Sequence, residues 1–523
     1  MISTENQLDE LHVVSDLHLG GIQGHQIFNQ GRALAALIDH LGAAPARRRV
    51  GLVLNGDIVD FLADRNATYL DPLGAADKLR LIFEDPAFRP VWDALARFTR
   101  TPDRVLALVL GNHDVELALP GVREVLLARL CGQDEGARGR VRIAMDGDGY
   151  ACEVGGRRVL CVHGNQADPW NPVDFDALHE VSDAVASGRK PPAWEPNAGT
   201  RLVVDVMNPV KMDFPFVDLL KPETAAVPAV LLAVGVEQQA PLAKFARIVV
   251  QRLYDQGRLA TGFLGSQAIG ELTDARALEL LIRPATWQDP TPRRAIAWEG
   301  IDWLRQATED DARGYRPVDL VDVSAGETLG LGGLLLDRLQ RRDPRENLRE
   351  ALVSFLERDR SFDVHAEDET FLQLDGHEKT ASADCVIAGH THLARRLPRR
   401  SGRGVYFNSG TWIRLIQLTP AMLTPEGFRP VYQALRAGTL EALDAIPGLV
   451  QQRRTVVAIW VDEEGAVHGE LRSALEAPEE GDPPRSRAWE PVEGTRYALP
   501  RRRGAGQRAP REPGAPAVKE TTS

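Results

Sequence analysis

The stretch VLALVLGNHD, from Val105 to Asp114, joins six apolar residues to a polar segment that begins with a glycine. An apolar run of this length is typical of a buried β-strand. The residues after it supply an amide oxygen from Asn112, an imidazole from His113 and a carboxylate from Asp114. Amide and carboxylate oxygens are ligands for hard cations, so the segment predicts a functional site at the end of a strand.

Four more segments show the same arrangement, an apolar run followed by oxygen or imidazole donors. They are Asp16-Leu17-His18, Gly56-Asp57, His163-Gly164-Asn165 and Gly389-His390-Thr391-His392. Residues i and i+2 of a strand point to the same side, so a D-x-H or H-x-H pair can hold one cation. The carboxyl ends of neighbouring strands meet at one edge of a sheet. The five segments therefore predict one shared metal site, although each motif alone is common by chance.

Strands and helices alternate in the first third of the chain, which is typical of a layered α/β domain. The predicted strands are residues 11–15, 50–54, 105–110, 141–143, 151–154 and 159–162. The predicted helices are residues 28–41 and 91–98. The pair Gly155-Gly156 between the last two strands predicts a tight hairpin turn.

The pattern becomes mostly helical after Asp168, and strands return near residue 384. We therefore predict a core formed by residues 1–170 and 383–475, with residues 171–382 as a helical insertion or cap. Residues 476–523 are predicted to be a disordered tail. Candidate helices of the insertion are residues 225–252, 275–282 and 346–356. Strands are expected at 384–388, 404–407 and 411–418, with a hairpin of 455–461 and 466–471 around Glu463-Glu464-Gly465. The tail is rich in Pro, Arg, Glu and Gly and poor in apolar residues, a composition that does not support a packed core.

The composition favours an ordinary globular protein over a nucleic-acid coat. The net charge is −12, and no basic–aromatic interleave is evident. The four cysteines are widely spaced, which predicts reduced core thiols. No signal peptide is visible, and the longest apolar run, near 225–236, is shorter than the roughly 20 residues that span a bilayer. We therefore expect a cytoplasmic enzyme; the oligomeric state is left open.

The order D-x-H, G-D, G-N-H-D, H-G and G-H-T-H resembles that of the calcineurin-like metallophosphoesterases. The resemblance covers roughly residues 11–170 and 383–420 and includes all five motifs. It implies a four-layer αββα sandwich, in which two mixed sheets lie between helices. Within the family, Ser15-Asp16-Leu17-His18-Leu19 and Gly111-Asn112-His113-Asp114 resemble the branch that includes the UDP-2,3-diacylglucosamine pyrophosphatases, but those enzymes are much shorter than this chain with its long insertion. Residues 163–171 also resemble uncharacterised bacterial phosphoesterases with an H-G-x-Q-x-D-P run.

The family pattern implies a role for each matching residue. One metal would be held by Asp16, His18, Asp57 and His392, and the second by Asn112, His163 and His390, with Asp57 as the bridge. His113 would be the general acid or would contact the phosphate, and Asp114 could orient His113 or help to hold its proton. Mixed nitrogen and oxygen ligation favours Mn²⁺, Fe or Zn²⁺ over Mg²⁺ or Ca²⁺. We expect Mn²⁺ first, although the sequence does not choose among the three.

This arrangement predicts hydrolysis of a phosphate ester or pyrophosphate bond in a small phosphorylated substrate. Two cations roughly 3.5–4 Å apart would lower the pKa of a bridging water and give a hydroxide near neutral pH. His113 would then protonate the leaving oxygen. The alternatives are a nuclease or cyclic-nucleotide phosphodiesterase on the same site, and a non-catalytic scaffold of the same fold. The intact ligands and the intact His113 argue against a scaffold.

Several residues around the five motifs are candidates for contact with the substrate. Asp168, Trp170 and Asn171 follow His163 closely, although Trp170 could equally pack the start of the insertion. His25 lies in the loop after the first motif, where it could contact substrate; the alternative is a solvent-exposed loop histidine. Residues 408–411 could support the ligands from outside, and the apolar stretch 227–236 could line an acyl groove or contact the inner membrane surface, with helix core as the alternative.

Overall fold

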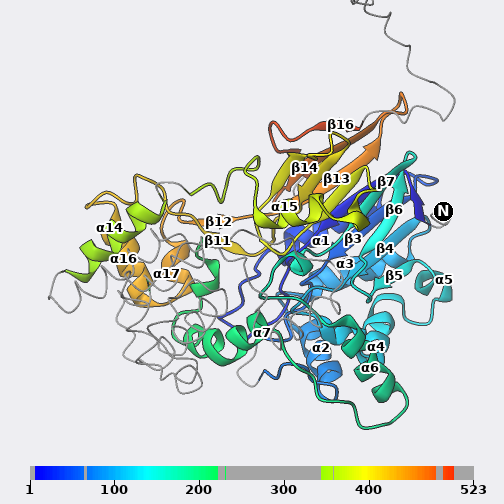
Figure 1. Cartoon of the computed structure of the whole chain (residues 1–523), viewed down its shortest axis with the longest axis horizontal. Helices are drawn as coiled ribbons and strands as arrows, with labels where there is room; N and C mark the ends of the chain where they lie inside the picture. Colours follow the sequence, from blue (N-terminus) through cyan, green and yellow to red (C-terminus); the bar gives the residue numbers. More distant parts are fainter. Residues whose placement is uncertain are drawn as a thin grey trace, which may run out of the picture.

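The computed structural model describes residues 6–63, 67–221, 230, 343–356, 359–478 and 487–499 of the 523-residue chain. Two large mixed sheets dominate it (Figure 1). Sheet I has the strand order β15-β14-β13-β2-β3-β4-β5, and β16 also pairs with β14. Its strands are β2 (Glu10–Val14), β3 (Val50–Asn55), β4 (Arg104–Val109), β5 (Val141–Ala144), β13 (Thr455–Val461), β14 (Val467–Ala474), β15 (Trp489–Pro491) and β16 (Tyr497–Leu499).

Sheet II has the order β1-β6-β7-β8-β10-β9. Its strands are β1 (Gln7–Leu8), β6 (Tyr150–Val154), β7 (Arg157–Cys161), β8 (Cys385–Ala388), β9 (Arg395–Pro398) and β10 (Val405–Asn408). The predicted hairpin at Gly155-Gly156 is confirmed, since β6 and β7 are antiparallel and both glycines have positive φ. The strand β8 follows the insertion yet pairs in parallel with β7, so residues far apart in sequence complete one sheet.

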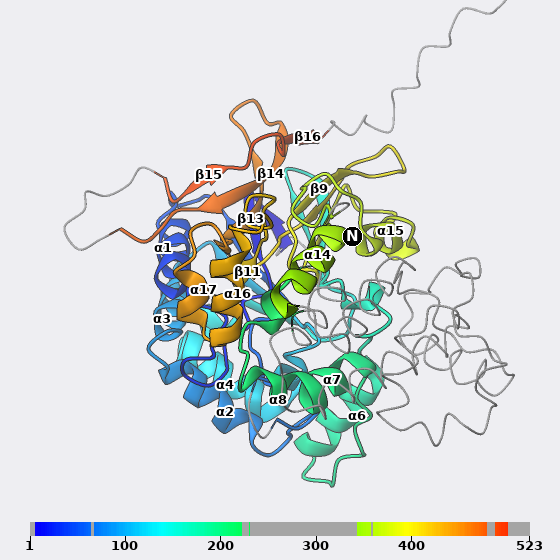
Figure 2. The same ribbon diagram turned by 90° about the vertical axis from the view of Figure 1, so that its left-hand side faces the viewer.

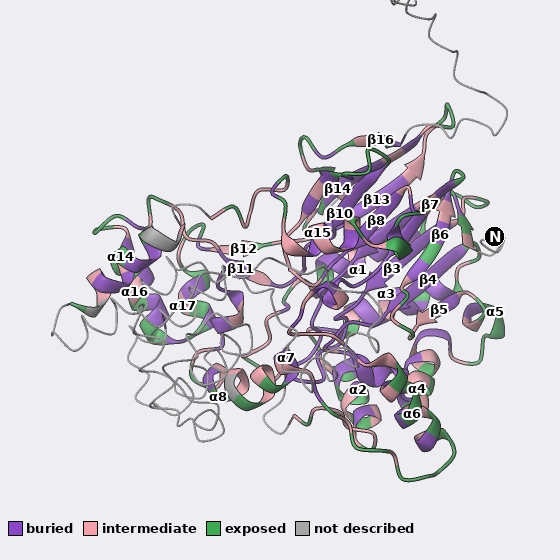
Figure 3. Cartoon of the chain, viewed as in Figure 1, coloured by how far each residue is buried: buried purple, intermediate pink, exposed green. Residues whose placement is uncertain are grey.

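The core forms two apolar layers around sheet I and a third outside sheet II. Strand residues alternate between faces: Val53 packs between the sheets with Ile387, whereas Leu52 and Leu54 pack against helices. These helices are α1 (Gly31–Gly42), α3 (Arg89–Arg100) and α4 (Pro120–Cys131). The outer face of sheet II is covered by α15 (Glu369–Asp375) through Phe371 and Leu374. The predicted layering of helices, two sheets and helices is confirmed, and Figure 3 shows its strands almost wholly buried.

Other helices lie beside this sandwich. Helix α2 (Ala75–Glu84) packs near α4, and α5 (Glu135–Arg138) precedes β5. After β7 the chain forms α6 (Phe175–Ala186), α7 (Ala198–Leu202), a π-helical turn (Val203–Met207) and α8 (Asn208–Lys211). Helices α14 (Pro344–Leu356), α16 (Phe428–Ala437) and α17 (Leu440–Asp444) gather with β11 (Arg414–Ile416) and β12 (Val450–Gln452) at one end of the molecule (Figures 1 and 2).

The insertion is helical where it is described, and the expected helix at 346–356 is α14. Its α15, however, covers sheet II and so belongs to the sandwich rather than to a separate cap. The candidate helices at 225–252 and 275–282, and the apolar stretch 227–236, lie outside the described residues apart from Val230. Among the described residues, none of the helices has the length and apolar character needed to cross a bilayer.

The prediction of a disordered tail from residue 476 was wrong for residues 487–499. Strands β15 and β16 both pair antiparallel with β14, and Leu499 is 4% exposed. They are three-residue edge strands, too short for a clear alternating pattern, which is why composition concealed them. The hairpin of β13 and β14 was predicted correctly, whereas the short strands β1, β9 and β12 were not predicted.

Candidate metal centre

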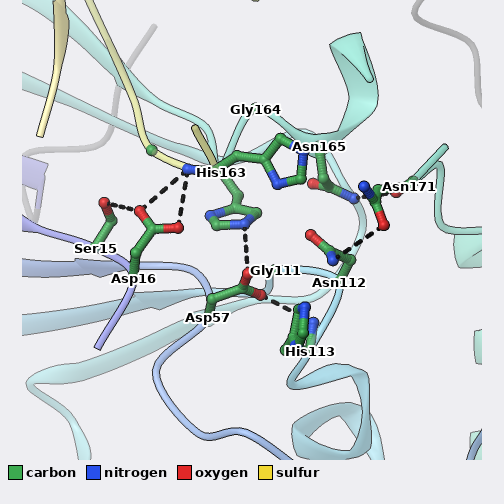
Figure 4. A network of polar contacts seen from close by, with 12 residues as sticks. Ser15, Asp16, Asp57, Gly111, Asn112, His113, His163, Gly164, Asn165 and Asn171 are labelled. Carbon is green, nitrogen blue, oxygen red and sulfur yellow. Dashed lines mark hydrogen bonds and ion pairs between the residues drawn. The ribbon is translucent and has the colours of Figure 1, made fainter. Parts of the chain in front are cut away.

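The five predicted segments meet where β2, β3 and β4 of sheet I and β7 and β8 of sheet II end. Three groups of side chains bring their ligand atoms within 4.8 Å of one another. They are Asp16 with His18 and His392, then His18 with Asp57 and His113, and finally Asp57 with His163 and His390. Because Asp57 and His18 are each shared by two groups, the three groups form one continuous cluster, part of which is drawn in Figure 4.

Asp57 lies at the centre of this cluster. Its Oδ2 is 3.2 Å from Nε2 of His163 and 3.8 Å from Nε2 of His18, and its Oδ1 accepts the backbone N–H of His113 at 2.9 Å. Burial alone would raise the pKa of this carboxyl, but His163 and His113 hold it well below its usual range. Asp57 is therefore an anion placed where positive charge converges.

Asp16 is fixed from three sides. Its carboxylate accepts the Ser15 hydroxyl and the backbone N–H of His390, the latter at 3.1 Å to each oxygen. Its carbonyl accepts the Thr411 hydroxyl at 2.7 Å, and Ser15 also contacts Ser409 Oγ at 2.7 Å. The first and the last of the five segments therefore contact each other directly, and residues of the predicted supporting stretch 408–411 hold them.

The donor atoms of the cluster fit a divalent cation. Nε2 of His18 faces Nε2 of His392 at 3.2 Å, so two nitrogen lone pairs converge unless one ring carries a proton there. His163 donates from Nδ1 to the Asn55 carbonyl at 2.9 Å, which leaves Nε2 as the nitrogen that faces Asp57. Outward hydrogen bonds of this kind are the usual way in which proteins orient ligand imidazoles. Within the described part of the chain, the buried Oδ1 of Asn112 has no hydrogen-bond partner, as expected of an amide oxygen that binds a cation.

The backbone is strained at the same residues. Seven non-glycine residues of the described chain have positive φ, and five of them are predicted ligands: Asp16, His18, Asp57, His390 and His392. This left-handed conformation is uncommon for residues with a Cβ. Such outliers concentrate at functional sites, where the surrounding structure enforces them.

Glycines beside the motifs allow the segments to approach each other. A Cβ on Gly56 would lie 2.3 Å from His163 Nδ1, and one on Gly111 would lie 2.1 Å from Asp57 Oδ1. A Cβ on Gly389 would lie 2.7 Å from Asp16 Oδ2. Each glycine therefore makes room for a ligand from another segment.

His113 is held by a carboxylate that the sequence analysis missed. Nδ1 of His113 lies 3.1 Å from Oδ1 of Asp60, whose other oxygen lies 3.1 Å from Nδ1 of His18. Burial alone would lower the pKa of His113, but Asp60 and Asp57 raise it to about 9. The signal that could have identified Asp60 is its place three residues after Asp57, in the same turn at the end of β3.

The expectation that Asp114 orients His113 was not met. Oδ1 of Asp114 accepts the N–H of Gly111 and Oδ2 accepts the N–H of Ile58, both at 2.7 Å. Asp114 therefore links the turns after β3 and β4, and Asp60 is the carboxylate that contacts His113. Sequence adjacency misled the prediction, because the side chains of neighbouring residues point in different directions.

The candidate substrate residues occupy two places. Oδ2 of Asp168 lies 2.8 Å from His390 Nε2, and Oδ1 of Asn171 accepts from Asn112 Nδ2 at 3.4 Å (Figure 4). The half-buried Trp170 lies between Asp168 and Asn171 in sequence, and its backbone N–H donates to Asp168. His25 lies elsewhere, with Nδ1 3.1 Å from the Lys211 carbonyl. Contact of these four residues with a substrate stays a prediction.

Comparison with known proteins adds one finding. Residues 11–215 match the family model described as calcineurin-like phosphoesterase. The match includes the first four motifs, and the fifth lies beyond it. No curated protein matches the chain. The match and the cluster of His and Asp side chains together indicate a metal-binding phosphoesterase domain, while the resemblance to the diacylglucosamine pyrophosphatase branch is not confirmed.

Proposed function

We propose that this protein hydrolyses a phosphate ester or anhydride at a centre that holds two divalent cations. The observation that carries the proposal is the shared position of Asp57, which belongs to one group with His18 and to another with His163 and His390. The family match over residues 11–215 supports the same reaction class. A single carboxylate between two sets of donors is the arrangement that a bridging ligand requires.

The donors divide into two sets around Asp57. Asp16, His18 and His392 form the first set, whose nitrogen and oxygen atoms lie within 4.8 Å of one another. Asn112, His163 and His390 form the second set. Divalent cations held there, with Mn²⁺ as the first expectation, would supply Lewis-acid chemistry by acidifying water and neutralising charge on the phosphoryl oxygens.

His113 is the proton donor in this proposal. Its backbone N–H is bonded to Asp57 and its Nδ1 to Asp60, so the ring is fixed at the edge of the cluster, and we assign it the role of acid rather than of ligand. Asp60 stabilises the protonated imidazole, and Nε2 is left as the nitrogen that can give a proton to the leaving oxygen. Asp60 also contacts His18, so one carboxylate positions both a ligand and the acid.

The proposal is tested with apoprotein to which Mn²⁺ is returned. We expect hydrolysis of at least one of three substrates: a phosphomonoester, a phosphodiester and a nucleotide-sugar diphosphate. Asp57→Asn should lose bound Mn²⁺. His113→Ala should keep Mn²⁺ but lose about 10²–10⁴-fold in kcat, the usual contribution of a general acid. His377→Ala, a change at a residue remote from the cluster, is the matched control.

Two outcomes would contradict the proposal. If the Mn²⁺-loaded protein turned over none of the three substrates, a non-catalytic scaffold would be favoured. If His113→Ala kept full activity, the proton-donor role of His113 would be wrong, but the proposed hydrolysis would still hold. Metal content measured on each variant separates these outcomes from simple loss of folding.

A further inference from the structure

One short loop contacts every member of the second donor set. Residues 163–171 begin with the ligand His163, and the loop then places Asp168 against His390 and Asn171 against Asn112. The first donor set is supported by other residues, namely Ser15 at Asp16 and Asp60 at His18. The side chains that support the two donor sets therefore differ, although the backbone N–H of His390 also bonds to Asp16.

Asp168 is held rigidly within this loop. Its Oδ1 accepts the N–H of Trp170 at 2.9 Å, and its Oδ2 accepts from Asn171 Nδ2 at 2.7 Å as well as from His390 Nε2 at 2.8 Å. A carboxylate accepts hydrogen bonds and donates none. His390 must therefore carry its proton on Nε2, which leaves Nδ1 as the nitrogen with a lone pair for a cation.

The same carboxylate determines how two amides are oriented. Because Asp168 only accepts, Asn171 turns its Nδ2 toward Asp168 and its Oδ1 toward Asn112. Asn112 then donates from its Nδ2 to Asn171, and its own Oδ1 is left on the side of His163 (Figure 4). This oxygen is buried, and it has no hydrogen-bond partner among the residues that the structure describes. The hydrogen bonds from Asn171 to Asp168 and from Asn112 to Asn171 therefore leave Oδ1 of Asn112 facing the cluster.

The start of the insertion backs this loop. The N–H of Gly199 donates to the Trp170 carbonyl at 2.7 Å, and Asn197 donates to the Pro172 carbonyl at 3.1 Å. A Cβ on Gly199 would lie 1.9 Å from Oδ1 of Asn171, so α7 leaves no room for that amide to move toward it. Asn171 is therefore fixed from both sides.

We propose that Asp168 and Asn171 are positioning residues: they determine that His390 offers Nδ1 and that Asn112 offers Oδ1 to a cation. They would thereby set the affinity of the second cation position alone. This inference rests on the proposed two-cation function. It assigns Asp168 and Asn171 a task on the protein's own ligands rather than on substrate. The carboxylate of Asp168 can only accept hydrogen bonds, so it determines which atoms of its neighbours donate. An amide in its place could also donate and would no longer determine this.

The test is Mn²⁺ binding to the full chain, measured by equilibrium dialysis with metal analysis. Wild type should bind two Mn²⁺. Asp168→Asn should weaken one of the two by about 10- to 100-fold, the usual cost of losing the outer partner of a ligand. The other position should keep its affinity. Electron paramagnetic resonance should show the change from a spin-coupled Mn²⁺ pair to an isolated ion, a signature that general destabilisation would not produce.

Three further variants sharpen the test. Asn171→Ala keeps the bond from Asp168 to His390 but removes the hydrogen bond to Asn112, so it should weaken the same position by a smaller factor. Gly199→Ala should act in the same direction without altering any residue that makes these hydrogen bonds. Asp174→Asn is the control, because Asp174 caps α6 through the N–H of Ala177 and touches no ligand.

The outcomes distinguish this inference from the proposed function. Two Mn²⁺ bound at wild-type affinity by Asp168→Asn, or equal weakening of both positions, would overturn the positioning role and leave the two-cation function intact. Fewer than two Mn²⁺ in the wild type would overturn both. If Asp168→Asn did not fold, Asn171→Ala and Gly199→Ala would decide the question by the same measurement.

Discussion

Five of the proposed ligands keep a left-handed backbone, and that conformation costs about 1–2 kcal/mol for each residue with a Cβ. The hydrogen bonds around them show why they keep it: the N–H of His390 reaches the Asp16 carboxylate, and the N–H of His18 reaches the Asp57 carbonyl at 2.9 Å. Each strained residue lies in the turn that aims its side chain into the cluster. The left-handed backbone at these positions therefore destabilises the fold but orients the ligand side chains.

This strain can be measured by comparing two substitutions of one ligand. His392 has φ of 62°, and its replacement by Ala or by Gly removes the same imidazole. In metal-free protein we expect His392→Gly to be more stable than His392→Ala by about 1 kcal/mol, because glycine adopts positive φ without steric cost. Urea unfolding of both variants checks the difference.

The matched control is His163, which is absent from the residues with positive φ. There the order should reverse, with Ala more stable than Gly, since glycine only adds freedom to the unfolded chain. A more stable Ala variant at both positions would show that the left-handed backbone at His392 is not strained.

At the scale of elements, the turns after β3 and β4 are packed so closely that one methyl group should disturb the centre. A Cβ on Gly111 would lie 2.1 Å from Oδ1 of Asp57 and 2.5 Å from its backbone nitrogen. The contact with the backbone nitrogen cannot be relieved by rotating a side chain, and Oδ1 is held by the N–H of His113. The position of Asp57 is thus fixed by a glycine in the turn after the neighbouring strand β4.

We expect Gly111→Ala to weaken Mn²⁺ binding by at least about 10-fold, although no ligand is removed, because the displaced Asp57 serves both donor sets. Isothermal titration calorimetry gives the affinity. Gly121→Ala, in the first turn of α4, is the control, because none of the described residues has an atom within 4 Å of its Cβ position outside its own helix and chain neighbours. It should leave Mn²⁺ binding unchanged, and equal effects of the two substitutions would refute the packing argument.

At the scale of the whole molecule, sheet I is completed by the C-terminal strands β15 and β16 on β14. The guanidinium of Arg472 on β14 lies between the rings of Trp460 and Trp489, at 4.6 and 4.5 Å. Leu499 of β16 joins the core between the two sheets. These strands therefore cover an edge that the sandwich would otherwise expose.

Removing residues 476–523 should lower the free energy of unfolding by at least about 2 kcal/mol, the scale of burying one large apolar side chain. Removing only residues 500–523 keeps both strands and is the control. Thermal and urea unfolding of the two truncated chains check the prediction. Equal stability of the two would mean that β15 and β16 contribute nothing to the sandwich.

The sequence predicted the parts of this molecule that repeat a strong local pattern. The strands that precede the five motifs are mostly buried, so most of their residues are apolar, and the polar residues at their ends identified the candidate ligands. Short edge strands such as β16 carry no such run. Asp60 was missed because its contacts with His18 and His113 depend on the turn after β3, and the misassignment of Asp114 has the same origin: a turn, not sequence distance, decides which side chains meet.

The direct bond between the segments at Asp16 and His390 has a consequence for how the protein is made. In the proposed assignment, the second donor set is incomplete until the ribosome has released residue 390 and the first until it has released residue 392, since His390 and His392 supply one ligand to each. The nascent chain would carry the earlier motifs, Asp57 and His163 among them, without a finished cation site until the fifth motif has been made. In the proposed function, metal binding would therefore follow the pairing of the fifth segment with the first.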